Sequence, residues 1–583
     1  MQEKAETAKA LTARALLTGA VLGALLVPCN VYSGLKIGWS FNMSIAGALL
    51  GLAFWRLAGQ LLGTRTWGLP ENLVNQTTAS SAASIVSGGL VAPIPALALL
   101  GGPVPEGALL MLWVFAVSVL GLGIAALLHG RFVANGKLPF PAGTAAAETL
   151  ADIHGDGGEA RSRLRWLGGA AGVSAALKLA AETTGATLRA TLPGSLPLGA
   201  GSALPSVGFR QLGIGIDGSL LMIGFGAIIG LRAGLSLALG ALVAWLGLAP
   251  WLLASGIVAP GEPGTVWFGA LVEWLIWPGV AMMTTGALAS LWLGRQRRDS
   301  AGAATRPGLP LPKPVLAVGA TLAVALVVGL QLALFDTPLP TALVAVLLAG
   351  LLAMVAARVV GETGIPPIGA LGKIAQLGTG SLAPGMPAAN LMGANVTGGA
   401  AGQTADLLND LKAGALLNTA PAPLFVAQLL GVLVGSIAGT ASYLLLIPDP
   451  AAQLLTPEWP APAVATWKAV AEVMAGGMAA LPPLSIPAAV LGALAGLLLA
   501  GWQHRAPARL AAWAPSASAA GLAFVIPAWI AFGLCLGALF ARLLERLAPH
   551  WAARALLATA AGLVAGESLA GVAAAMTQLL GGG

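Results

Sequence analysis

Apolar segments of about 20 residues recur along the chain from residue 11 to residue 578, and they restrict the fold more than any other feature. A helix of that length spans a bilayer core of roughly 30 Å. Only 9% of the residues are charged, against about 25% in soluble domains. Period-two apolar strands are absent from the sequence, which excludes a barrel and leaves helices. We therefore predict an all-α polytopic membrane protein. The predicted spans are 11–29, 40–58, 73–92, 107–128, 166–184, 212–231, 233–255, 267–293, 314–334, 340–358, 421–447, 464–481, 487–502, 514–541 and 555–578.

The basic residues are confined to connections between these spans. They begin with Lys4 and Lys9, and by the positive-inside rule they predict a cytoplasmic N-terminus. The expected location is the cell inner (plasma) membrane. Because the net charge of +7 is confined in this way, we exclude a nucleic-acid partner. A basic stretch at 295–313 predicts a cytoplasmic linker between an N-terminal transmembrane half, 1–294, and a C-terminal half, 314–583.

Two segments do not fit ordinary spans. Residues 139–151 are apolar over about a dozen positions and have basic residues on both sides, which favours a re-entrant segment over a short helix pinched by prolines. Residues 386–408 either cross or fold back, so the side of the C-terminus stays open. A weak internal similarity between Gln76-Thr77-Thr78-Ala79 and Gln403-Thr404-Ala405 supports two related halves, as in transporters with a site between broken helices.

Residues 390–414 hold the highest density of polar groups, among glycines that allow the backbone to bend. Asp406 and Asp410 would share one helix face. Two carboxylates that close do not both ionise easily when water is removed, which suits a proton carrier. Lys412 could neutralise one of them. The alternative is a solvated helix end at the cytoplasmic surface.

Motifs for enzymatic chemistry are absent from the sequence, which contains no HExxH, no GxSxG and no Walker loop. All four histidines fall in predicted connections, so we predict neither a metal site nor a cofactor. A transporter driven by an ion gradient is the large class that remains. GxxxG spacings such as Gly431 to Gly435 would suit packing faces within the chain or in a homodimer. With 80 glycines in 583 residues, such spacings also arise by chance.

Four motifs resemble those of the oligopeptide transporter family, which includes peptide carriers and the yellow-stripe carriers of metal chelates. Asn30–Trp39 is similar to N-x-Y-x-G-L-K-x-G-W, and Glu71–Ser80 to E-N…Q-T-x-A-S. Leu138–Ala145 is similar to L-P-F-P-x-G-T-A, and Asp410–Gly414 to D-L-K-x-G. The family often has Glu where this chain has Ala142.

The resemblance implies a fold of about 16 transmembrane helices in two related halves, as in prokaryotic-type members. It also implies proton-coupled import of small oligopeptides or peptide-like metal chelates, with the proton gradient as the driving force. A passive channel or a lipid-handling membrane protein on the same fold is the alternative. The stretch 390–414 would face Gln76–Thr77 and Leu138–Ala145 across a shared cavity. Residues expected to bind substrate are Asn30, Tyr32, Lys36, Gln76, Thr77, Asn395 and Gln403, and proton candidates are Glu148, Asp406 and Asp410. Lys36 would be a partner for a substrate carboxylate.

Overall fold

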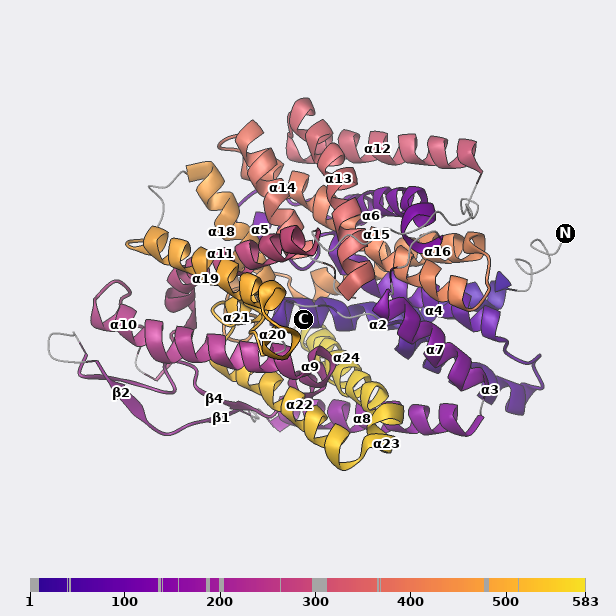
Figure 1. Cartoon of the computed structure of the whole chain (residues 1–583), viewed down its shortest axis with the longest axis horizontal. Coiled ribbons are helices and arrows are strands. Elements are labelled where there is room, and N and C mark those ends of the chain that lie inside the picture. Colours follow the sequence, from indigo (N-terminus) through magenta and orange to yellow (C-terminus); the bar gives the residue numbers. More distant parts are fainter. Residues whose placement is uncertain are drawn as a thin grey trace. The chain divides into compact units, whose positions relative to one another are not determined.

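The protein is an all-α polytopic membrane protein, as predicted (Figure 1). A computed structural model describes residues 10–581 except 39, 41–42, 135–137, 139, 156, 185–188, 199–203, 263, 296–311, 364–365, 367, 477–481 and 512. Within that part of the chain, twelve helices are long and apolar enough to cross a membrane. The number of about 16 transmembrane helices stays a prediction.

The chain folds into two compact units, each assembled from separate stretches of sequence. Unit 1 comprises Met1–Gly34, Trp39–Arg165 and Asp299–Pro448, and unit 2 comprises Leu35–Gly38, Trp166–Arg298 and Asp449–Gly583. Each unit thus contains stretches of both predicted halves. Most of the predicted linker 295–313 lies outside the described residues, and the division into related halves stays a prediction.

Within its described residues, the regular elements of unit 1 are all helices. Its elements are α2 (Ala13–Ile37, whose last residues belong to unit 2), α3 (Ser44–Leu62), α4 (Leu69–Ala83), η1 (Ser84–Gly88), α5 (Pro93–Leu99), α6 (Gly107–His129), η2 (Gly130–Ala134), α7 (Pro141–Gly155), α12 (Lys313–Phe335), α13 (Leu339–Thr363), α14 (Ile368–Leu382), α15 (Pro387–Leu416) and α16 (Pro421–Leu446).

Unit 2 adds two short antiparallel strand pairs, β1–β4 and β2–β3, to its helices. Its elements are most of α8 (Gly157–Thr184), β1 (Arg189–Thr191), β2 (Ser195–Pro197), β3 (Ser206–Gly208), β4 (Gly215–Asp217), α9 (Leu220–Ala241), η3 (Leu242–Leu248), α10 (Ala249–Ala254), α11 (Phe268–Arg295), α17 (Pro450–Gln453), α18 (Pro462–Gly476), α19 (Ser485–Arg505), α20 (Ala508–Ala511), α21 (Ala517–Leu522), α22 (Ala528–Leu547), α23 (Pro549–Trp551), η5 (Ala552–Leu556) and α24 (Leu557–Gly581).

Helix α15 is the core helix of unit 1. It is continuous over 30 residues, so the glycines of the polar stretch do not bend or interrupt it as the sequence suggested. It packs against α13, α6, α14 and α7. The glycines serve close packing instead: a Cβ atom on Gly402 would lie 2.8 Å from Cβ of Ser87 in η1, and one on Gly121 of α6 would lie 2.6 Å from the Ala400 carbonyl.

Small residues also decide the packing of α16. A Cβ atom on Gly431 would lie 2.5 Å from the Thr78 carbonyl of α4, and one on Gly435 would lie 2.6 Å from the Ala82 carbonyl. This GxxxG spacing is therefore a packing face inside unit 1, where small residues let two helix backbones approach closely. A homodimer stays a prediction.

Two local predictions need correction or refinement. The span predicted at 212–231 begins only at Leu220, because β4 and a turn precede it. Within α9, Gly230 has a left-handed backbone (φ 80°), which places a kink near the predicted boundary between 212–231 and 233–255.

Helix α7 has 15 residues and a length of about 22 Å, too short to cross a membrane. Re-entrance of 139–151 stays a prediction.

Candidate functional site

Gln76 and Asp410 join two of the predicted motifs directly. The Gln76 side-chain amide donates to Asp410 Oδ1 over 3.1 Å and to the Thr77 hydroxyl over 2.8 Å. Gln76 and Thr77 are fully buried, and Asp410 is 3% exposed. The alternative of a solvated helix end therefore does not hold for Asp410. The residues predicted to face one another across a cavity are in direct contact at this point.

The second acidic residue, Asp406, lies one turn earlier on α15 and is half-buried. The predicted helical spacing of the two carboxylates is confirmed. No ion pair joins either one to Lys412, although all three residues are described. Asp410 is therefore shielded from water, and no cation of α15 compensates its charge. In such surroundings it is costly for Asp406 and Asp410 to be ionised at the same time.

The Leu138–Ala145 motif meets the same end of α15. A Cβ atom on Gly143 of α7 would lie 2.3 Å from the backbone oxygen of Asn409. Glycine is therefore required for the approach of α7 to the residue that precedes Asp410. Phe140 is buried and donates its backbone N–H to the Gly361 carbonyl of α13 over 2.9 Å. Pro139 lies outside the described residues.

Earlier on α15, the amide side chains of Asn395 and Gln403 hold the segment η1. Asn395 donates to the Gly88 carbonyl over 3.1 Å. Gln403 donates to the Ser84 carbonyl and to the Ser87 hydroxyl, both over 3.3 Å. Because η1 follows α4 directly, these bonds place the end of α4 against α15.

Three amide oxygens along this contact have no hydrogen-bond partner within the described part of the chain. They are Oε1 of Gln76, Oε1 of Gln403 and Oδ1 of Asn409, and all three are buried. A buried acceptor without a partner costs about 1–3 kcal/mol. Such oxygens can accept hydrogen bonds from N–H groups, which peptides carry in every non-proline unit.

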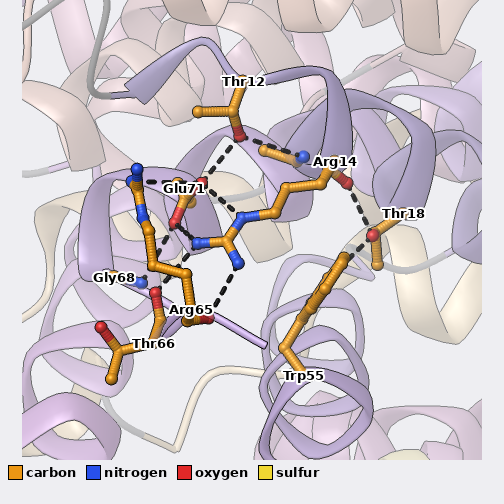
Figure 2. Close-up of polar contacts among 9 residues, drawn as sticks. Thr12, Arg14, Thr18, Trp55, Arg65, Thr66, Gly68 and Glu71 are labelled. Carbon is orange, nitrogen blue, oxygen red and sulfur yellow. Dashed lines mark hydrogen bonds and ion pairs between the residues drawn. The ribbon is translucent and has the colours of Figure 1, made fainter. Parts of the chain in front are cut away.

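The beginning of α4 is anchored by an ion pair that Figure 2 shows in detail. The Arg14 guanidinium donates from Nε to Glu71 Oε1 over 2.8 Å and from Nη2 to Glu71 Oε2 over 2.5 Å. Thr12 donates to the same carboxylate over 2.8 Å. The guanidinium also donates to the carbonyls of Arg65 and Thr66, each over 2.9 Å. Glu71, 3% exposed, thus ties α4 to α2 and to the chain before α4.

The next polar residues of α4 hold it against α3. Asn72 donates to the Ala48 carbonyl over 3.1 Å, and Asn75 donates to the Gly47 carbonyl over 2.9 Å. The E-N part of the motif therefore fixes the register of α4, and Gln76, one helical turn farther on, is positioned by these bonds. Sequence reasoning assigned no role to Glu71 or Arg14.

The remaining predicted residues of unit 1 have different environments. Asn30 is fully buried and donates to the Ala83 carbonyl of α4 over 2.9 Å. Tyr32 is buried in the same helix, α2. Glu148 is exposed on α7, unlike Asp406 and Asp410. Of the proton candidates, Asp410 alone is both buried and hydrogen-bonded to a predicted substrate residue.

Lys36 belongs to unit 2, where it is part of a charged cluster. Its ammonium group lies 3.8 Å from Glu458 Oε2, donates to the Glu458 carbonyl, and lies 4.9 Å from the centre of the Trp459 ring. Arg189 Nη2 lies 3.6 Å from Glu458 Oε1, and Arg189 Nε donates to Asp217 Oδ2 over 3.4 Å. Sequence reasoning missed Arg189 and Glu458 as partners, because both fall between the predicted spans, where charges are expected.

Comparison with known proteins gives a consistent result. The profile of the family described as "OPT oligopeptide transporter protein" matches residues 10–578. A Haemophilus influenzae protein named "Putative oligopeptide transporter" is 30% identical over 234 residues, 39% of this chain and 33% of that protein. An Oryza sativa protein named "Probable metal-nicotianamine transporter YSL9" is 27% identical over 185 residues, 31% of this chain and 26% of that protein. The aligned parts span about a third or less of these relatives.

Proposed function

Because this chain belongs to the OPT oligopeptide transporter family, we propose that it is a secondary active transporter that imports small oligopeptides or peptide-like metal chelates together with protons. The names of its relatives, an oligopeptide transporter and a metal-nicotianamine transporter, support both substrate classes. We place it in the plasma membrane. We orient it with its N-terminus in the cytoplasm, as the distribution of basic residues indicates.

The hydrogen bond between Gln76 and Asp410 carries this proposal. It links Gln76, which is expected to bind substrate, to the buried carboxylate of Asp410, the group that we propose takes up the proton. The free oxygen of the same Gln76 side chain can accept a hydrogen bond from a peptide N–H group. Gln76 can therefore respond to both the substrate and the proton.

The coupling follows from the chemistry of the two side chains. An ionised Asp410 accepts the Gln76 amide hydrogen, whereas a protonated Asp410 can donate its own O–H to the free Gln76 oxygen. The protonation state thus changes which Gln76 atoms remain for the substrate. Because these side chains are buried in this conformation, a solute reaches them only after helices separate, as alternating access requires.

Uptake by the full chain in proteoliposomes tests the proposal. The probes are labelled trialanine and the nickel complex of nicotianamine, each offered with and without an inward proton gradient. We expect one of them to accumulate above its external concentration only when the gradient is imposed. Saturable uptake that ignores the gradient would contradict proton coupling. Unsaturable uptake that ignores it would favour a passive channel.

A further inference from the structure

We propose that Lys36 and Arg189 of unit 2 form a carboxylate-binding subsite, held in this structure by the chain's own Glu458, which a substrate carboxylate displaces. The inference rests on the proposed transport of peptides or chelates. The sequence already indicated Lys36 as a partner for a substrate carboxylate, and the structure adds three residues that it did not indicate, Arg189, Glu458 and Trp459.

Glu458 occupies the position between the two cations. One carboxylate oxygen lies 3.6 Å from Arg189 Nη2, and the other lies 3.8 Å from Lys36 Nζ. A carboxylate with one oxygen toward each cation is therefore the anion that this spacing accommodates. A peptide C-terminus, and the carboxylates of an amino-acid-derived chelator, present the same group.

The two cations are fixed by the fold independently of the Glu458 carboxylate. Arg189 is paired with Asp217 across the β1–β4 ladder. Its guanidinium also lies 3.9 Å from the ring centre of the buried Trp529, a favourable cation–π contact. Lys36 lies in the last turn of α2 and donates to the backbone carbonyl of Glu458. Both cations are therefore positioned before a ligand arrives.

The exposures of these side chains differ in the way that displacement requires. Lys36 and Arg189 are 17% and 19% exposed, whereas Glu458 is 65% exposed. Ion pairs that face water contribute little, about 0–1 kcal/mol each, so Glu458 can leave at small cost. Asp217 stays with Arg189 when Glu458 leaves. The incoming substrate carboxylate then takes over the charge compensation that Glu458 provides in this structure.

The aromatic ring beside Lys36 adds selectivity. Trp459 lies against Lys36 and is partly exposed, whereas Trp529, which lies against Arg189, is buried and only positions that cation. The indole ring of Trp459 favours a ligand whose carboxylate is attached to an organic body over a small inorganic anion, because the ring offers apolar contact area. The subsite is thus suited to a peptide or a carboxylate chelator.

Binding to the purified full chain tests this inference with three probes: trialanine, trialanine amide and nickel–nicotianamine. Glu458→Gln should raise the affinity for whichever carboxylate-bearing probe the chain binds. The expected increase is about two- to fivefold, the factor that an exposed ion pair represents. This variant keeps the backbone carbonyl that Lys36 contacts. Arg189→Gln and Lys36→Gln should weaken the same probe about tenfold. If that probe is trialanine, Arg189→Gln and Lys36→Gln should also bind trialanine no more tightly than trialanine amide.

Glu472→Gln is the matched control, since it removes a carboxylate from the ion pair with Lys468 on α18, which includes neither Lys36 nor Arg189. If a probe binds but Glu458→Gln behaves like Glu472→Gln, and Arg189→Gln binds like the wild type, the subsite is wrong while the proposed function stands. If neither trialanine nor nickel–nicotianamine binds any variant, the proposed function fails and the subsite fails with it.

Discussion

Gln76 and Asp410 stand 334 positions apart in the sequence, yet the amide nitrogen of the first lies 3.1 Å from a carboxylate oxygen of the second. The bond joins α4 to α15 within unit 1. Each residue belongs to one of the four motifs that together resemble the family, and the structure shows that these two motifs are parts of one buried arrangement. This contact is the basis of the predictions that follow.

Asp410→Asn should separate substrate binding from proton coupling. The asparagine oxygen can still accept from Gln76, so the packing of α4 and α15 is kept, but the side chain no longer exchanges a proton. We expect unchanged substrate binding and loss of gradient-driven accumulation. Asp152→Asn, the same exchange at an ion pair with Arg163 in which Asp152 is 49% exposed, is the control. Full accumulation by Asp410→Asn would remove this carboxylate from the mechanism.

The stability of the buried contact can be measured by a double-mutant cycle. Gln76→Leu leaves the Asp410 carboxylate buried without its donor and should lower the free energy of unfolding by about 1–3 kcal/mol. Gln76→Leu combined with Asp410→Leu removes both polar groups and should cost less than the sum of the two single changes. Denaturant unfolding in detergent provides the measurement, and strictly additive effects would show that the bond contributes nothing.

The Arg14–Glu71 pair should be far more important for stability than a surface pair. Arg14→Gln leaves the buried Glu71 with only the exposed Arg65, 4.0 Å away, as a cation, which costs at most about 3–5 kcal/mol. Arg14→Lys should restore only part of this, because an ammonium group cannot replace the bidentate guanidinium. Arg542→Gln breaks a pair whose residues are 49% and 46% exposed and should cost at most about 1 kcal/mol. Equal effects of Arg14→Gln and Arg542→Gln would contradict the anchoring role.

Gly143 should not tolerate a side chain. In Gly143→Ala the new Cβ atom would lie 2.3 Å from the Asn409 backbone oxygen, so α7 has to move away from α15. We expect a loss of about 1–3 kcal/mol and weaker uptake. A Cβ atom on Gly155 of the same helix would have no neighbouring atom of the described residues within 4 Å, and Gly155→Ala should be harmless. Equal thermal stability of the two variants would argue against the close contact.

The sequence allowed the membrane class and many of the helices to be predicted, because apolar length and charge placement are local properties. It also indicated residues of α4 and α15 that the structure brings into contact, Gln76 and Asp410, since polar groups in an apolar chain stand out. It left open whether 386–408 crosses or folds back, and the structure has one continuous helix there, α15, packed among other helices. The partners of Lys36 were not predictable, because Arg189 and Glu458 lie in connections and only tertiary folding brings them together.

Proton entry that accompanies substrate entry tests the central claim most directly. The full chain is reconstituted in vesicles that contain a pH-sensitive dye, without any imposed gradient, and the transported probe is added outside. The account predicts acidification of the vesicle interior that depends on the probe, is retained in Asp152→Asn and is lost in Asp410→Asn. Probe entry without acidification in the wild type, or the same acidification in Asp410→Asn, would contradict it.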